Sequence, residues 1–357
     1  MSTTDLRRAL EADLSAVVPP PGDLARATRE GRRIRRRRRA TAATAAVVAA
    51  AAVTVVAVQV TGGTTVRDPH PVAPLGRLDF SEGLRAYAAP GAEIHLGGRT
   101  FPASRMQFLD TDATATPYGV LFYDAGVPRL LGESGEVTDL EPGADTSSSH
   151  FTSKVDSQGP LVAYGVVRDG QPTVTVRNLA TDEVVGRHDI SRDTVIDGLD
   201  AGVVLLRTPD GTTTWDSRTD AVQELAGRET RVADVRNGVI LYDGSAPDGA
   251  AAAAYRLVKG AVDAQLTYDG QHVLDWSSVL QPTEPGGEPV RLEQGPAQRG
   301  ALGFWAVDTD GSVLVATVTH RYPHYDVFDC EVPAGNCVKL GPLVARHGDP
   351  MFIGADM

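Results

Sequence analysis

One short stretch of the sequence places histidine, tyrosine and aspartate at every second position. His320, Tyr322, His324 and Asp326 lie in THRYPHYDVF, and alternate residues of a strand share one face. Two imidazoles and a carboxylate could bind a metal ion. However, no fourth ligand is indicated, and Pro323 suggests an edge or bulged segment. We therefore predict a solvated outer hairpin here, with a metal site as the alternative.

Two further stretches resemble fragments of calcium-binding loops. Asp308, Asp310 and Ser312 lie in DTDGS, and Asp110 and Asp112 lie in DTDAT. Neither stretch has the complete series of alternating acidic residues or the distal Glu that a calcium loop requires. Turn chemistry explains both better, so we predict no metal and no cofactor.

The chain has two cysteines, Cys330 and Cys337, which flank a Pro-Ala-Gly-Asn turn between two apparent strands. This spacing places them opposite each other near the neck of a hairpin, within reach of a disulfide bond. It matches neither a zinc site nor a thioredoxin motif. We predict a structural disulfide between Cys330 and Cys337, which requires an oxidising compartment.

Common catalytic motifs are missing from the sequence. It has no G-x-S-x-G elbow, P-loop or H-E-x-x-H motif, and no G-x-G-x-x-G at a strand-to-helix junction. The absence of these motifs favours a non-catalytic protein, but it does not exclude an enzyme, because catalytic residues can also come together from distant loops. Trp215, Trp276 and Trp305 are expected to pack between sheets.

After about residue 77, short Val, Ile, Leu, Thr and Tyr runs alternate with turn signals. Asp-Gly recurs seven times, and Asn237-Gly238 adds a further signal for a tight hairpin turn. Runs such as VLFY, LVAYGVV, VVLLR, VILY and LVATV are almost continuously apolar, which predicts inner strands buried on both faces. Runs such as EVVGRHDI alternate more and predict outer edge strands. Long stretches of helical period are missing after residue 76, so the fold class is all-β.

These strands recur in similar units, which begin roughly 30 to 45 residues apart and match a four-stranded propeller blade. The visible units are 118–140, 159–190, 194–225, 231–262, 266–292 and 301–340. Residues 77–104 and the C-terminal PMFIG could jointly form one more unit and close the ring. We therefore predict a β-propeller of seven blades, alternatively six, over residues 77–357.

Residues 40–60 are 21 residues without a charge, which is about 31 Å of helix and enough to cross a bilayer. The preceding arginines predict that residues 1–39 are cytoplasmic and that the propeller is extracytoplasmic; residues 61–76 form an extended Gly/Pro/Thr linker. The orienting arginines, which face anionic lipid, are Arg32, Arg33, Arg35, Arg36, Arg37, Arg38 and Arg39. A cleaved signal peptide is the alternative, although 39 residues precede the apolar run and no clear cleavage site follows it.

Charge is divided sharply along the chain. Residues 1–39 contain eleven Arg and five acidic residues, a net charge of +6, so the remainder carries −18 of the total of −12. An acidic outer surface favours cationic partners or metal ions and disfavours nucleic acid. Within the tail, Leu6, Leu10, Leu14 and Val17 have helical spacing. This segment could lie on the membrane surface or dock onto a cytoplasmic partner.

This layout resembles that of single-pass membrane proteins of actinobacteria with an extracytoplasmic WD40-like or YVTN-like β-propeller. The matching features are LRRALEADLSAVVPPPGDLARATREGRRIRRRRR, then an Ala/Val helix, then units with Asp-Gly turns. The Gly-His and Trp-Asp pairs of true WD40 blades are missing. The resemblance implies fold and topology but no catalytic residue.

The combined expectation is a membrane-anchored module in which the propeller binds or senses an unknown protein or envelope ligand, without its own catalysis. Two alternatives remain open at this point. The chain could hold a cytoplasmic factor, such as a sigma factor, on its N-terminal tail, or it could be a hydrolase or lyase that acts on envelope polymers.

Overall fold

The computed structural model describes most of the chain after residue 82. The described residues are 83–88, 93–102, 113–132, 134–146, 151–261, 263–275, 277, 279–293, 304–318, 324–344 and 351–352. They lie within one compact unit, Pro71–Met357. Among them, no helix has the length and apolar composition that a membrane crossing needs. The predicted tail, membrane segment and linker fall outside the described residues.

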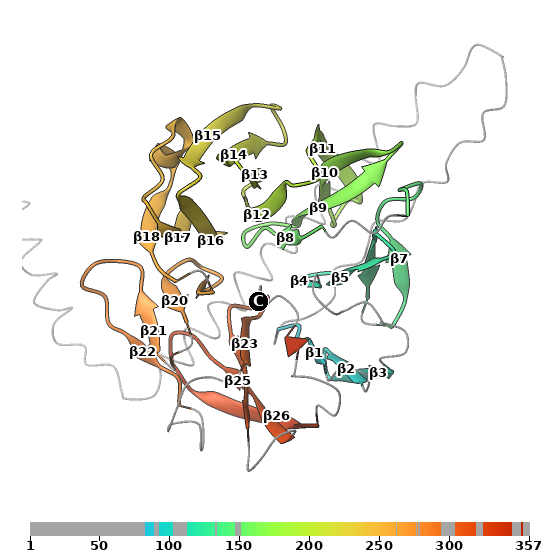
Figure 1. Ribbon diagram of the computed structural model, residues 1–357. Helices are drawn as coiled ribbons and strands as arrows, with labels where there is room; N and C mark the ends of the chain where they lie inside the picture. Colours follow the sequence, from blue (N-terminus) through green and yellow to red (C-terminus); the bar gives the residue numbers. More distant parts are fainter. Residues whose placement is uncertain are drawn as a thin grey trace, which may run out of the picture. The chain divides into compact units, whose positions relative to one another are not determined.

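The described chain forms a ring of sheets, and the labelled first strands β4, β8, β12, β16 and β23 lie nearest its centre (Figure 1). Neighbouring strands run antiparallel except β17 and β18. One sheet contains β4 (Thr114–Thr116), β5 (Gly119–Asp124), β6 (Val127–Leu131) and β7 (Val137–Asp139). The sheet after it in the chain contains β8 (Ser153–Val155), β9 (Leu161–Arg168), β10 (Gln171–Asn178) and β11 (Glu183–Asp189). The next sheet contains β12 (Val195–Asp200), β13 (Val203–Thr208), β14 (Gly211–Asp216) and β15 (Val222–Gly227).

The sheet that follows has only three strands. It contains β16 (Thr230–Arg236), β17 (Val239–Gly244), the 3-10 helix η2 (Ala250–Ala254) as a connection, and β18 (Arg256–Lys259). Two four-stranded sheets come after it. The first contains β19 (Gln265–Leu266), β20 (His272–Leu274), β21 (Val279–Pro282) and β22 (Val290–Arg291). The second contains β23 (Phe304–Val307), β24 (Val313–Val318), β25 (His324–Cys330) and β26 (Cys337–Val344).

The sheet that closes the ring combines both ends of the described chain. It contains β1 (Tyr87–Ala88), β2 (Glu93–Leu96), β3 (Arg99–Pro102) and, next to β1, β27 (Met351–Phe352). Tyr87 pairs with Phe352, and Ala88 pairs with Met351. The predicted closure by residues from both ends is therefore present. In total the described residues form six four-stranded sheets and one three-stranded sheet, so the all-β propeller is confirmed.

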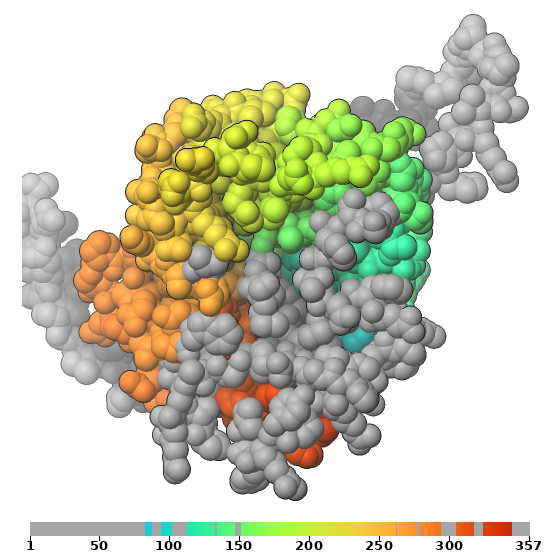
Figure 2. Space-filling model, viewed as in Figure 1, coloured from blue at the N-terminus to red at the C-terminus, as the bar shows by residue number. Residues whose placement is uncertain are grey.

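The apolar runs of the sequence lie one position further out than we predicted. VLFY, LVAYGVV, VVLLR, VILY and LVATV fall in β5, β9, β13, β17 and β24, which are second strands and not inner strands. A second strand is covered on both faces by the neighbouring sheets, and β9 is buried at seven of its eight residues. The inner strands are shorter or more polar, as in SKV of β8. In Figure 2 the sheets coloured green to yellow pack side by side.

The tight turns were predicted correctly at two Gly-containing pairs. Asp-Gly at 169–170 joins β9 to β10, and Asn-Gly at 237–238 joins β16 to β17, with positive φ at all four residues. The Asp-Gly pair at 197–198 was a wrong prediction, because it lies inside β12 at a register shift. A Cβ at position 198 would lie 2.1 Å from a methyl carbon of Val235. Glycine there allows the next sheet to approach and does not make a turn.

Candidate functional site

The DTDGS stretch forms the turn between β23 and β24, as predicted, and it also closes the ring. The backbone N–H of Gly311 donates to the Asp308 carbonyl at 3.0 Å, and that of Ser312 donates to Asp310 Oδ1 at 2.9 Å. The buried Asp308 carboxylate accepts the N–H of Leu84 on Oδ1 at 2.9 Å and the N–H of Arg85 on Oδ2 at 2.8 Å. The side chain of Asp308 therefore joins the last complete sheet to the segment that precedes β1.

Burial raises the pKa of Asp308 to about 6, and the nearby Asp310 carboxylate adds to this effect. Next to it, the Arg85 guanidinium contacts Asp329 Oδ2 through Nε at 3.0 Å and Nη2 at 2.9 Å. Burial also raises the pKa of Asp329, and the Ser312 hydroxyl and Arg85 oppose this. At the closure of the ring, Asp329 is therefore ion-paired with the Arg85 guanidinium, while Asp308 holds the backbone of the same residue.

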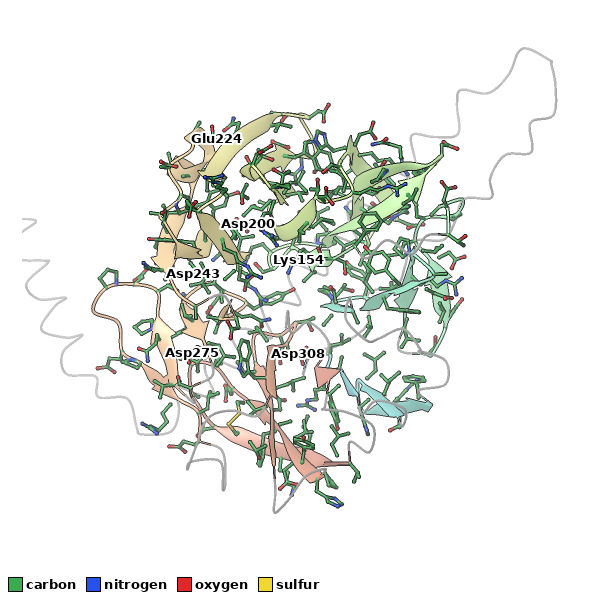
Figure 3. All side chains as sticks on the ribbon, viewed as in Figure 1. Lys154, Asp200, Glu224, Asp243, Asp275 and Asp308 are labelled. Atoms are coloured by element: carbon green, nitrogen blue, oxygen red, sulfur yellow. A yellow bond between two sulfur atoms is a disulfide. The ribbon has the colours of Figure 1, made fainter. Side chains whose placement is uncertain are left out.

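Related carboxylates lie at two other junctions between sheets. Figure 3 labels Asp200 and Asp308. Asp200, at the end of the inner strand β12, accepts the N–H groups of Asn237 and Gly238 at 3.0 and 2.9 Å. Asp156, directly after the inner strand β8, accepts the N–H of Gln158 in its own turn at 2.9 Å. Burial raises the pKa of Asp156, and the backbone of Ala201 in the next sheet opposes this. Asp200 thus holds the first turn of the next sheet, and Asp308 holds the segment that leads into β1. We call Asp156, Asp200 and Asp308 the junction carboxylates.

A fourth carboxylate connects neighbouring sheets from inside a strand. Asp234 of β16 accepts the N–H of Leu266 in β19 on Oδ2 at 2.9 Å, and Arg236 Nε lies 3.0 Å from the same oxygen. The junction carboxylates and Asp234 come from different sheets. Each accepts backbone N–H groups, which a buried polar group needs to offset its loss of water.

A buried ionic cluster connects the sheet β4–β7 to the sheet β8–β11. Glu141, which follows β7 and is 2% exposed, contacts Arg168 and Arg187 through Oε1, with 2.8 Å to Arg187 Nη2. The Tyr164 hydroxyl donates to Glu141 Oε2 at 3.0 Å, and burial raises the pKa of Tyr164. Arg177 Nε donates to the Tyr164 oxygen at 3.0 Å. One carboxylate therefore holds three strands of the next sheet, β9, β10 and β11.

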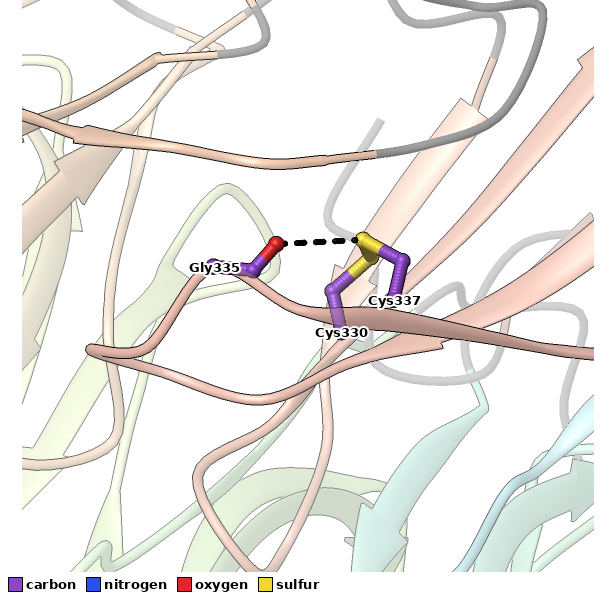
Figure 4. Close-up of a disulfide and its surroundings, with 3 residues drawn as sticks. All are labelled: Cys330, Gly335 and Cys337. Atoms are coloured by element: carbon purple, nitrogen blue, oxygen red, sulfur yellow. Dashed lines mark hydrogen bonds between the residues drawn. A yellow bond between two sulfur atoms is a disulfide. The ribbon is translucent and has the colours of Figure 1, made fainter. Parts of the chain in front are cut away.

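The predicted disulfide between Cys330 and Cys337 is present (Figure 4). The two residues are direct cross-strand partners in β25 and β26, with Cα atoms 4.0 Å apart. Cys330 is fully buried in the cluster that contains Trp305 and Phe328. The disulfide therefore fixes the outermost hairpin of its sheet to the core.

The proposed histidine-rich face is only partly described. His324 is exposed at the start of β25, and Asp326 contacts Lys339 of β26 at 2.7 Å, so this end of the stretch is an outer hairpin as predicted. His320 and Tyr322 lie outside the described residues, as do Asp110 and Asp112. Over the part of the chain that is described, no three His, Cys, Asp or Glu side chains are grouped so as to hold a metal ion.

Two of the three tryptophans lie in the core. Trp215 is 1% exposed, stacks on His188 of the preceding sheet with ring centroids 5.2 Å apart, and donates its Nε1–H to Asp220 at 2.8 Å. Trp305 is 6% exposed and packs against residues of the sheet that precedes it. Packing between sheets was predicted for both. Trp276 lies outside the described residues.

No protein-family model matches the sequence, and no curated protein sequence matches it. Several solved structures are similar. TolB from Acinetobacter baumannii has a TM-score of 0.38 and 10% identity, over 74% of this chain and 64% of that chain. A putative TolB from Agrobacterium tumefaciens has a TM-score of 0.34 and 12% identity, over 69% of this chain and 85% of that chain. A prolyl endopeptidase has a TM-score of 0.37 and 16% identity, over 66% of this chain and 42% of that chain. Similarity this low concerns the fold and says nothing of activity.

Proposed function

We propose that the chain is a membrane-anchored, extracytoplasmic β-propeller that binds a protein or envelope ligand and has no catalysis of its own. The observation that carries this proposal is the use of the buried carboxylates. Buried acids with raised pKa are the groups from which acid–base sites are built. Here Asp308 instead accepts two backbone N–H groups across the closure of the ring, and Asp156 accepts the N–H of Gln158 within its own turn. This use supports a rigid ring that presents its loops for binding.

The three-stranded sheet counts as a blade in this proposal, which makes the propeller seven-bladed. The uncharged segment 40–60 and the arginines from Arg32 to Arg39 support the anchor and its orientation. The disulfide supports an oxidising compartment for the propeller. The proposed partners are membrane lipid for the anchor and an unknown protein or envelope ligand for the propeller.

A thiol-labelling experiment tests the proposed topology. Both native cysteines are paired, so Glu229→Cys adds one free thiol, at a side chain that is 78% exposed. We expect a membrane-impermeant maleimide to label this full-length variant in intact cells. The matched variant Ser2→Cys should be labelled only after the cells are permeabilised. Labelling of Glu229→Cys only after permeabilisation would show that the proposed orientation is wrong.

A further inference from the structure

The sheet β16–β18 is one strand narrower than the other six. After β17 the chain returns through η2, so β18 lies parallel to β17, and Ile240 pairs with Leu257. On the outer side of β18, no described residue pairs with its backbone. In Figure 1, β18 is the outermost strand of its sheet. The position that a fourth strand fills elsewhere in the ring is open here within the described chain.

The backbone of β18 alternates between its two sides. The N–H of Arg256 donates to Gly238 at 2.8 Å, and the N–H of Gly260 donates to Tyr242 at 2.9 Å, so these residues face β17. In a parallel ladder alternate residues face the same neighbour. The N–H and C=O groups of Leu257 and Lys259 therefore point away from β17. They give the outer edge two donors and two acceptors at the spacing that an added strand uses.

The side chains of β18 determine what kind of strand fits. Leu257 and Val258 are half-buried at the margins of two apolar clusters. Arg256 is already paired with Glu284 at 3.0 Å. Lys259 is exposed, and no described carboxylate lies within ion-pair distance of it. Although the chain after residue 39 is acidic overall, this edge itself presents an exposed lysine. An apolar residue opposite Val258 and an acidic residue opposite Lys259 therefore match it, because opposite charges across a strand pair are stabilising.

We propose that the outer edge of β18 binds an extended, acidic peptide segment of a partner protein, which completes the sheet as its fourth strand. A second copy of the chain fits the edge less well. Symmetric antiparallel pairing of two edges through Leu257 and Lys259 places each lysine opposite a leucine, with no carboxylate to meet it. This proposal deepens the proposed binding function and rests on it, since it names a surface and the partner's chemistry.

Amide hydrogen exchange of the full-length chain in detergent tests this proposal. The probe is a synthetic seven-residue peptide in which valine and threonine alternate around one glutamate, and the control has lysine in place of glutamate. We expect the glutamate peptide to slow exchange at Leu257 and Lys259 by about tenfold. The amide of Val258, which faces β17, should change little. The lysine peptide should protect these amides several-fold less at equal concentration.

The variant Lys259→Glu reverses the charge on the edge of β18 and so tests the preference for the glutamate peptide. It changes an exposed side chain, so the fold should be retained, and it should reverse the preference in favour of the lysine peptide. Three outcomes would overturn the proposal: no protection at saturating peptide, protection without peptide that grows with protein concentration, or protection without peptide at every concentration. The second would assign the edge to another copy and the third to a segment of the same chain. None of these outcomes bears on the thiol-labelling result, so the two proposals fail separately.

Discussion

Asp308 accepts a backbone hydrogen bond from Leu84, a residue 224 positions earlier in the sequence. The bond is 2.9 Å long and buried, and it lies where the first and last parts of the ring meet. Loss of the carboxylate leaves the N–H groups of Leu84 and Arg85 without their partner, at a cost of about 1–3 kcal/mol for each buried group. Asp308 thus adds a buried side-chain contact to the pairing of β27 with β1 that closes the ring.

We predict that Asp308→Ala lowers the free energy of unfolding by about 2–4 kcal/mol. Urea-induced unfolding of the full chain, followed by tryptophan fluorescence, measures this change. Asp310→Ala is the control, because Asp310 bonds the N–H of Ser312 within its own turn, and it should cost about 1 kcal/mol. Equal losses of unfolding free energy in the two variants would show that the contact across the closure stabilises the fold no more than the bond within the turn does.

The raised pKa of Asp308 predicts a dependence of stability on pH. Its pKa is about 6 in the folded chain, against about 3.9 for an unfolded aspartate. The folded state therefore binds the proton of Asp308 more tightly than the unfolded state does. The stability that this tighter binding contributes is fully present below pH 4. It is lost as the pH rises to about 6, by roughly 3 kcal/mol in total.

Unfolding of the wild type and of Asp308→Asn, measured at intervals from pH 4 to pH 7, checks this sign. Asparagine does not titrate, so the difference in unfolding free energy between the two proteins should change across this range and level off above pH 6. A constant difference over the whole range would contradict the raised pKa.

The cluster around Glu141 predicts that a conservative substitution of this residue lowers the free energy of unfolding substantially. Glu141→Gln keeps the shape of the side chain but leaves Arg168 and Arg187 without the carboxylate that they share. We expect a loss of about 2–4 kcal/mol in unfolding free energy, because partly buried guanidinium groups lose their counter-charge. Glu183→Gln, at an exposed position on β11, should change it by less than about 0.5 kcal/mol. A similar small change in both variants would mean that solvent screens the cluster.

Loss of the disulfide should destabilise the outer hairpin. The bond closes a loop between residues seven positions apart, which corresponds to about 2–3 kcal/mol in the chain-entropy model. The double variant Cys330→Ser/Cys337→Ser and the chemically reduced wild type should show the same loss in urea unfolding. If reduction leaves the unfolding midpoint unchanged, the hairpin is held by its strand pairing alone.

Several features of the fold could be predicted because their signals are local. Alternation and turn residues marked the strands, and recurrence marked the sheets. The disulfide followed from two cysteines on either side of a turn. The inner strands were misassigned because an apolar run shows that a strand is buried on both faces but not which position in the sheet has that property. In this propeller it is β9 and its counterparts in second place.

The role of the junction carboxylates between sheets could not have been inferred from the sequence. Asp156 and Asp200 look like ordinary acidic turn residues, and the backbone groups with which they interact across the junction lie in the next sheet. The cluster around Glu141 has the same difficulty, because its three arginines are dispersed over three strands. Each side chain alone resembles a solvated surface charge, and only the packing of sheets brings the charges together. The recurrence of an acidic residue after the inner strand was the one available signal.

The shared sheet of β27, β1, β2 and β3 also has a consequence for how the protein is made. Among the described strands, β27 is synthesised last, and it pairs with β1 in the sheet whose other strands are synthesised first. Until then the edge of β1 has no neighbour, and an open strand edge is a template for pairing with other chains. During synthesis this edge of β1 is therefore a site for aggregation, and the pairing of β27 with β1 removes it.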